Sequence, residues 1–289
     1  MPLRDQEKYN IKVIGEPSEV TEIRKKILES FNGLEFVDEG HKYFLNGEEL
    51  ISVSVLAGRF ESEFDTVEKA RSYAIKNGET PEYWMDKWRF TNLKATVTGT
   101  QVHSYAESLA WLHIGHPENI TEDNKYKYIE DKGWLIPTRH KEEAALKFWE
   151  DFKDNNMYVV LPETRVYSSP NPDLPRFKEN YAGTFDLLLY YKHPTDDSKS
   201  GLVIADWKTN GNIYKDFSRL NHKMMKEPFQ DCFDEPYGGY TVQLNAYQIP
   251  LEDIGLKVIG RRIIWLKDDG TYEVVKVDNV TKKLRKYLS

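Results

Sequence analysis

Residues 183–208 read GTFDLLLYYKHPTDDSKSGLVIADWK, and this stretch decides the fold. It contains two apolar runs, residues 184–191 and 202–207, separated by a polar stretch rich in turn-forming residues, which is the pattern of a β-hairpin. The two runs carry Asp186 and Asp206, although aspartate is unfavourable in strands and rarely buried. The sequence therefore predicts two core strands whose acidic side chains need compensating partners.

A lysine follows the second aspartate in the tripeptide DWK. Side chains alternate along a strand, so Asp206 and Lys208 are expected on one side and Trp207 on the other. Carboxylates that converge, as Asp186 and Asp206 would, suggest a hard divalent cation such as Mg²⁺, beside which a lysine can orient a water. A buried ion pair without catalysis is the alternative interpretation of the same residues.

The order GTFD then DWK resembles the metal-binding core of the PD-(D/E)xK nuclease superfamily, in its RecB-like exonuclease branch. That branch, which includes phage exonucleases and the mitochondrial genome maintenance exonuclease, also has an upstream helix with a histidine and a downstream helix of the form Q-x-x-x-Y. Both are found here in that order, as GTQVH at 99–103 and QLNAY at 243–247. The resemblance covers roughly residues 96–275 and extends more weakly to HKY at 41–43 and SVSV at 52–55.

The resemblance implies an α/β fold with a mixed central β-sheet flanked by helices, a restriction-endonuclease-like core. We expect this nuclease core in residues 96–289. Residues 1–95 would form a mostly helical N-terminal extension with a hairpin, a candidate wall of a DNA channel. Asn46-Gly47, between alternating apolar residues, predicts the turn of that hairpin.

The same resemblance implies a Mg²⁺ or Mn²⁺ site with ligands among His103, Glu107, Glu163, Asp186 and Asp206. His103 and Glu107 are four residues apart on an expected helix, capped by Thr98 or Thr100, and so share a face. A lone histidine on a helix is usually not a ligand, and the GTQVH context favours one here. Glu107 is a further ligand, an acceptor that orients His103, or a surface charge. Glu163 is a ligand or simply a glutamate near a strand end.

The expected catalytic residues are Asp186, Asp206, Lys208, Gln243 and Tyr247. Lys208 would position or activate the attacking water. The Gln243–Tyr247 pair would support the site through polar contacts with the substrate or the metal-bearing strands.

The whole chain has 289 residues, a formal net charge of −7 and one cysteine, Cys232. One cysteine excludes a disulfide framework, a cysteine-based zinc site and the four-cysteine iron–sulfur cluster of some RecB-like nucleases. No signal pattern or membrane-length apolar run is found, so we expect an intracellular protein without a membrane partner, in the cytoplasm of a bacterial or phage-infected cell. No P-loop sequence is present, so any helicase motor would be a separate protein.

Two stretches are candidates for DNA contact. Residues 209–239 form a long irregular connection that could be a flap over DNA. It contains Lys215, Arg219, His222, Lys223 and Lys226, and its four Lys and Arg residues would contact phosphate. Trp84 and Trp88, one helical turn apart, form either a stacking platform for bases or part of the core, and we favour the core.

These observations together predict a metal-dependent DNA exonuclease that acts on single-stranded DNA or DNA ends in replication, recombination or repair. A helicase, a recombinase or a single-strand-binding protein is a candidate partner. The alternatives are an endonuclease or flap nuclease of the same fold and a non-catalytic DNA-binding subunit. The residues do not distinguish DNA from RNA.

Overall fold

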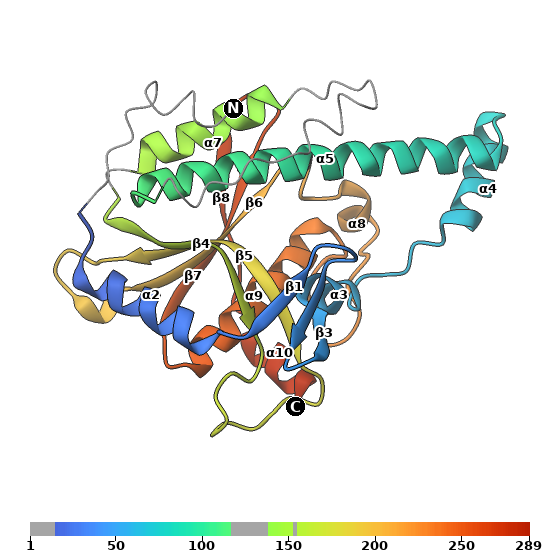
Figure 1. Ribbon diagram of the computed structural model, residues 1–289. Coiled ribbons are helices and arrows are strands. Elements are labelled where there is room, and N and C mark those ends of the chain that lie inside the picture. The colour runs from blue at the N-terminus through green and yellow to red at the C-terminus, as the bar shows by residue number, and fades with distance from the viewer. Residues whose placement is uncertain (1–14, 117–137, 153–154) are drawn as a thin grey trace.

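A mixed eight-stranded sheet with helices on both faces forms the centre of the protein in the computed structural model, which describes residues 15–116, 138–152 and 155–289 (Figure 1). This confirms the predicted fold class. The strands follow the order β1-β2-β3-β5-β6-β7-β8, and β4 pairs with β5. Their bounds are β1 Leu34–Val37, β2 Lys42–Leu45, β3 Glu48–Ser52, β4 Met157–Tyr167, β5 Tyr181–Tyr191, β6 Gly201–Lys208, β7 Val258–Leu266 and β8 Tyr272–Lys276.

Two hydrophobic cores, one on each face of the sheet, hold the helices in place. Buried residues of α5 and α7 pack with Trp207 on one face, and buried residues of α2, α3, α9 and α10 pack with Ile204 on the other. The described helices are α2 Ser18–Ser30, α3 Val53–Gly58, α4 Thr66–Asn77, α5 Pro81–His113, α7 Arg139–Phe152, α8 Asp216–Leu220, α9 Pro236–Asp253 and α10 Thr281–Leu288, with a short 3₁₀ helix at Asp197–Lys199.

The hairpin predicted in residues 183–208 is confirmed, because β5 and β6 pair antiparallel from Leu187–Ala205 to Tyr191–Gly201. Strand β4 pairs with β5 over most of its length, so β3 and β6 must share the other edge of β5. Strand β3 pairs there only with Tyr181 and Ala182. Residues 183–186, the GTFD sequence, are therefore left between β3 and β6, at a fork in the sheet.

Gly183 is required at this fork by a close approach of two helices. A Cβ atom at this position would lie 2.8 Å from Cε1 of Tyr247 on α9 and 2.9 Å from Cγ2 of Val53 on α3. Both distances are shorter than van der Waals contact. The glycine of GTFD thus lets α9 pack directly against the strand that carries Asp186.

Helix α5 differs from the expected helix, because the start predicted at Thr98 or Thr100 is wrong. The helix has 33 residues and begins at Pro81, where the Thr80 side chain accepts a hydrogen bond from the Tyr83 amide at 3.2 Å. At about 1.5 Å per residue it is about 50 Å long. The expected domain boundary at residues 95 and 96 lies inside this helix, and residues 1–14 of the expected extension lie outside the described residues.

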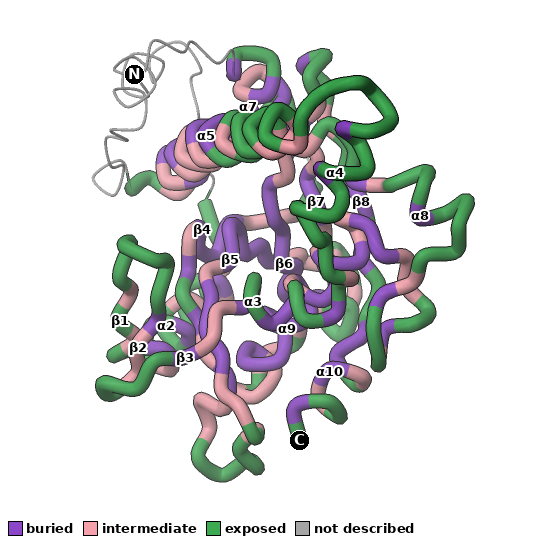
Figure 2. The backbone as a smooth tube through the Cα atoms, turned by 90° about the vertical axis from the view of Figure 1, so that its right-hand side faces the viewer, coloured by how far each residue is buried: buried purple, intermediate pink, exposed green. Residues whose placement is uncertain are grey.

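The first half of α5 extends beyond the sheet and packs against α4. The buried residues of α5 begin only at Val97, and Figure 2 shows the α4 end of the helix as largely exposed. Here Trp84 and Trp88 lie 5.2 and 5.6 Å from the ring of Tyr73 on α4. The two tryptophans are half-buried in this small aromatic cluster, so they belong neither to the main core nor to an open platform.

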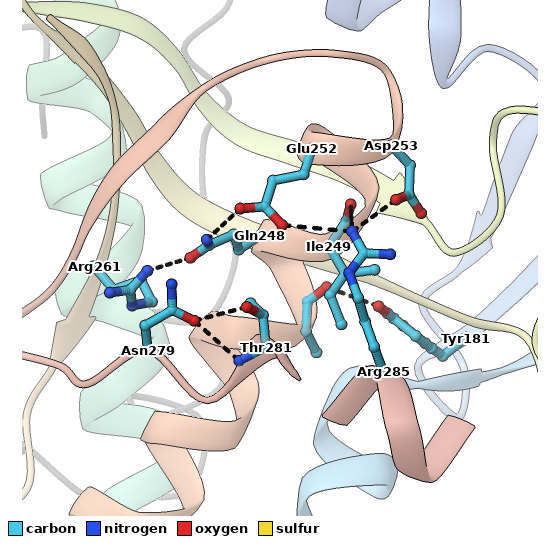
Figure 3. A network of polar contacts seen from close by, with 10 residues as sticks. Tyr181, Gln248, Ile249, Glu252, Asp253, Arg261, Asn279, Thr281 and Arg285 are labelled. Atoms are coloured by element: carbon cyan, nitrogen blue, oxygen red, sulfur yellow. Dashed lines mark hydrogen bonds and ion pairs between the residues drawn. The ribbon is translucent and has the colours of Figure 1, made fainter. Parts of the chain in front are cut away.

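A polar network fixes α9 against β7 and α10 (Figure 3). Arg261 of β7 donates to the Gln248 side-chain oxygen, and Gln248 in turn donates to Glu252 at 2.7 Å. From α10, Arg285 donates to Asp253 at 2.7 Å. These charge-assisted bonds hold the helix that carries Gln243 and Tyr247 in a defined position.

Candidate metal centre

A cavity of about 1000 Å³ opens at this fork, where residues 183–186 of β5 lie between β3 and β6. All eight residues predicted for the site line it: His103 and Glu107 from α5, Glu163 from β4, Asp186 from β5, Asp206 and Lys208 from β6, and Gln243 and Tyr247 from α9. Residues separated by up to 144 positions in the chain thus converge on one space.

Asp186 is held by two hydrogen-bond donors at the fork. Its Oδ2 accepts from the Trp207 amide at 2.8 Å, and Nδ1 of His103 lies 3.2 Å from the same oxygen. Burial alone would raise the pKa of Asp186, but His103, Lys208 and the Trp207 amide lower it below its usual value. Burial likewise opposes charge on His103, yet the Asp186 carboxylate outweighs burial and raises the pKa of His103.

Glu163 lies across the β4–β5 ladder from Asp186, because Pro162 faces Leu187 and Thr164 faces Phe185. Its backbone has a φ of 40°, which is uncommon for a residue with a side chain and is the kind of strain often found at functional sites. One ligand atom each from His103, Glu163 and Asp186 lie within 4.8 Å of one another. Burial, and then the Asp186 and Glu107 carboxylates, raise the pKa of Glu163 well above its usual value.

Asp206 and Lys208 project to the same side of β6, as predicted, and their Oδ2 and Nζ atoms lie 2.5 Å apart. The side chains are 1% and 13% exposed. The contact lacks hydrogen-bond geometry, so Oδ2 of Asp206 has a counter-charge but no hydrogen bond. Burial and the neighbouring Asp186 raise the pKa of Asp206 to about 6, although Lys208 opposes this.

Lys208 remains protonated in this setting. Burial by itself lowers its pKa, but Asp206 and Asp186 outweigh burial and raise the pKa above its ordinary value. The ring of Tyr240, on α9, lies 4.4 Å from Nζ, within cation–π range. Lys208 is therefore a hydrogen-bond donor and not a base.

Two of the predicted site residues, Glu107 and Gln243, form hydrogen bonds with other side chains of the protein. Glu107 lines the cavity and its Oε1 accepts from Nε1 of Trp111 at 3.0 Å, so one of its oxygens already has a protein partner. On α9, Gln243 donates to the Tyr247 hydroxyl at 3.2 Å. Burial, and then Asp206, raise the pKa of Tyr247 well above its usual value, so its hydroxyl is protonated.

Two residues of the site were missed by the sequence analysis. Tyr240 precedes Gln243 by three positions and Tyr247 by seven, so helical spacing alone places all three on one face. Arg165 follows Glu163 by two positions on a strand, so alternation places both on the same side. Both signals were available in the sequence.

Most of the Lys and Arg residues of 209–239 that were expected to contact DNA phosphate form ion pairs within the protein instead. Arg219 contacts Glu235 at 2.8 Å, Lys223 contacts Asp234 at 2.7 Å, and Lys226 lies 3.5 Å from Glu63. Three of the four Lys and Arg residues expected to contact phosphate thus have carboxylate partners.

The donor set at the fork fits a hard divalent cation. His103, Glu163 and Asp186 form a close group of carboxylate oxygens and one imidazole, the ligand types that suit Mg²⁺ and Mn²⁺, and Asp206 lines the same cavity outside that group. Burial, and then repulsion by Asp186, raise the pKa values of Glu163 and Asp206, and a bound cation would relieve that repulsion.

A scan of the chain against protein-family models finds no match, and a comparison with curated proteins finds none either. Within residues 15–116, 138–152 and 155–289, no helix combines the length and apolar character needed to cross a membrane.

Proposed function

We propose that the protein is a metal-dependent DNA exonuclease that hydrolyses phosphodiester bonds in single-stranded DNA or at DNA ends. The observation that carries this proposal is the convergence of three carboxylates and His103 beside a protonated lysine in one open cavity. A structural ion pair would need neither the excess of carboxylates nor an open cavity. The order of the sequence motifs supports the same chemistry.

Glu163, Asp186, Asp206 and His103 would hold Mg²⁺ or Mn²⁺. When bound, the ion supplies polarisation of the phosphoryl oxygen and neutralises the charge on the leaving oxygen. The ion pair between His103 and Asp186 fixes the orientation of both side chains.

Lys208 would position the attacking water. Its protonated Nζ, held between the Asp206 carboxylate and the face of Tyr240, donates hydrogen bonds to a water or to a phosphate oxygen. Gln243 and the protonated Tyr247 hydroxyl lie on the α9 side of the same cavity and can donate to the substrate.

The test is cleavage of linear and circular single-stranded DNA, labelled at the 5′ or 3′ end, with Mg²⁺, Mn²⁺ or EDTA. We expect metal-dependent loss of linear DNA, and a rate about a thousandfold lower for Lys208→Ala. Lys25→Ala, which alters a solvent-exposed lysine on α2, is the matched control and should cleave at the wild-type rate. Degradation of circular DNA would instead favour an endonuclease. DNA binding without cleavage under either metal would contradict the proposal and favour a binding subunit.

A further inference from the structure

The cavity has a second end whose chemistry is opposite to that of the carboxylates. This end is formed by the β1–β2 hairpin and the last part of β4, and it is lined by Phe36, His41, Tyr43 and Arg165, with one carboxylate, Asp38, in the hairpin turn. Figure 2 shows the hairpin at the edge of the molecule, with many of its residues exposed. An incoming chain could therefore reach this end from solvent.

Arg165 is a charged group without a carboxylate partner. Lys208 and His103, also on the cavity wall, each contact an aspartate. No carboxylate among the described residues forms an ion pair with Arg165, whose guanidinium instead lies 5.0 Å from the ring of Phe36. The cations Lys208 and His103 thus have carboxylate partners in contact, whereas Arg165 has only a longer-range attraction to Glu163, and its guanidinium is available to a ligand.

The aromatic side chains next to Arg165 are held in place by contacts with one another and with β5. The ring of Phe36 contacts His41 edge-on at 4.9 Å and Tyr43 at 5.0 Å. The Tyr43 hydroxyl lies 3.0 Å from Oγ1 of Thr184, the residue that faces Arg165 across the β4–β5 ladder. A guanidinium held against a fixed aromatic surface loses less conformational freedom when it binds an anion.

The position of Arg165 relative to the metal site sets what it can bind. Glu163 and Arg165 are two residues apart on β4, so their Cα atoms are at most about 7 Å apart, and both residues line the cavity. That separation is comparable with the repeat of one nucleotide in an extended single strand. A phosphate at the carboxylate end therefore places its neighbour near Arg165.

We propose that Arg165, held against Phe36, binds the DNA phosphate next to the scissile one, and that the substrate strand runs from the carboxylates towards the β1–β2 hairpin. This inference rests on the proposed nuclease function and adds a binding site to it. The phosphate is either a terminal monoester or an internal diester. A guanidinium can form paired hydrogen bonds with either.

The first test is DNA binding without metal, which does not depend on cleavage. Fluorescence anisotropy with a single-stranded oligonucleotide in EDTA compares wild type with Arg165→Gln, Arg165→Lys, Phe36→Leu and the control Arg139→Gln, whose side chain on α7 is 84% exposed. Loss of the charged contact should weaken binding about tenfold in Arg165→Gln. It should also reduce the slope of log Kd against log salt by about 0.7, the value for one phosphate on a single strand.

The conservative variants separate binding from folding. Arg165→Lys keeps the charge and should keep the salt slope with a smaller loss of affinity, and Phe36→Leu should weaken binding only a few-fold, because the guanidinium is less well held. Oligonucleotides with a 5′-phosphate or a 5′-hydroxyl identify the source. An Arg165 effect confined to the phosphorylated end assigns a terminal phosphate, and an equal effect on both assigns an internal one.

The second test is cleavage with Mg²⁺, in which Arg165→Gln should raise KM with kcat within about threefold of wild type, as expected when ground-state and transition-state binding are lost equally. If Arg165→Gln behaves like Arg139→Gln in affinity and salt slope, or if the wild-type protein does not bind single-stranded DNA, this inference is wrong. Wild-type binding without cleavage, with the Arg165 effect retained, would contradict the nuclease function and leave the phosphate site standing.

Discussion

At the strand fork, carboxylates from α5, β4, β5 and β6 share one cavity with Lys208 and His103, whereas in residues 209–239 Arg219 and Lys223 each have their own buried acidic partner. Both regions are dense in charge when read as sequence. At the fork, burial and mutual repulsion raise the pKa values of Glu163 and Asp206. In the connection, Arg219 and Lys223 lower those of Glu235 and Asp234, against the effect of burial. At the fork the carboxylates outnumber the cations, which favours a ligand site, whereas in the connection Arg219 and Lys223 are paired one to one with acids, which favours a structural role.

The largest expected effect on stability comes from breaking a compensated pair. Glu235 is 1% exposed, and its carboxylate accepts from the Arg219 guanidinium and, at 2.8 Å, from the Lys215 amide. Glu235→Gln should lower the free energy of unfolding by about 2 to 3 kcal/mol, as for other hydrogen bonds to charged groups. Urea unfolding measures this. An unchanged midpoint would mean that the connection adds little to global stability.

Acid should weaken the same region. The folded-state pKa of Glu235 lies below its unfolded value of about 4.3, so its contribution is complete above that pH and is lost as the pH falls through the folded-state value. Wild type should therefore lose more stability than Glu235→Gln between about pH 6 and pH 3. Urea midpoints at several pH values test this, and parallel curves for the two proteins would contradict it.

At the fork, replacing a carboxylate by an amide should stabilise the metal-free protein, whereas in the connection it should destabilise the protein. Glu163→Gln removes a charge that its neighbours oppose, so the metal-free protein should become more stable by about 1 kcal/mol, while Mg²⁺ binding and cleavage fall. Thermal unfolding with EDTA and with Mg²⁺ measures both effects. Equal Mg²⁺-induced shifts of Tm in wild type and variant would show that Glu163 is not a ligand.

The smallest effect is expected at an exposed pair. Lys226 lies 3.5 Å from Glu63, whose side chain is 95% exposed. Glu63→Gln should change the free energy of unfolding by less than about 0.5 kcal/mol, because solvent screens such pairs. A loss as large as that of Glu235→Gln would show that burial does not separate the two kinds of pair.

The sequence by itself determined the elements around the fork. Alternating apolar residues and a polar turn specified β5 and β6, and the period of two placed Asp206 and Lys208 on one side, because strand geometry is local. The inward face of α7 was also predictable: Ala144, Ala145, Phe148, Trp149 and Phe152 are all buried.

Only the tertiary structure decided how far α5 extends and which charges are compensated. Thr98 and Thr100 have the chemistry of helix caps, but their neighbours on both sides are helical, so a good capping residue does not by itself begin a helix. Arg165 and Arg219 are indistinguishable as residue types in a sequence. Arg219 has the buried Glu235 as its partner, whereas Arg165 lies against the ring of Phe36 at the mouth of a cavity. Long-range folding, not the local pattern, brings the partner of each charge into contact.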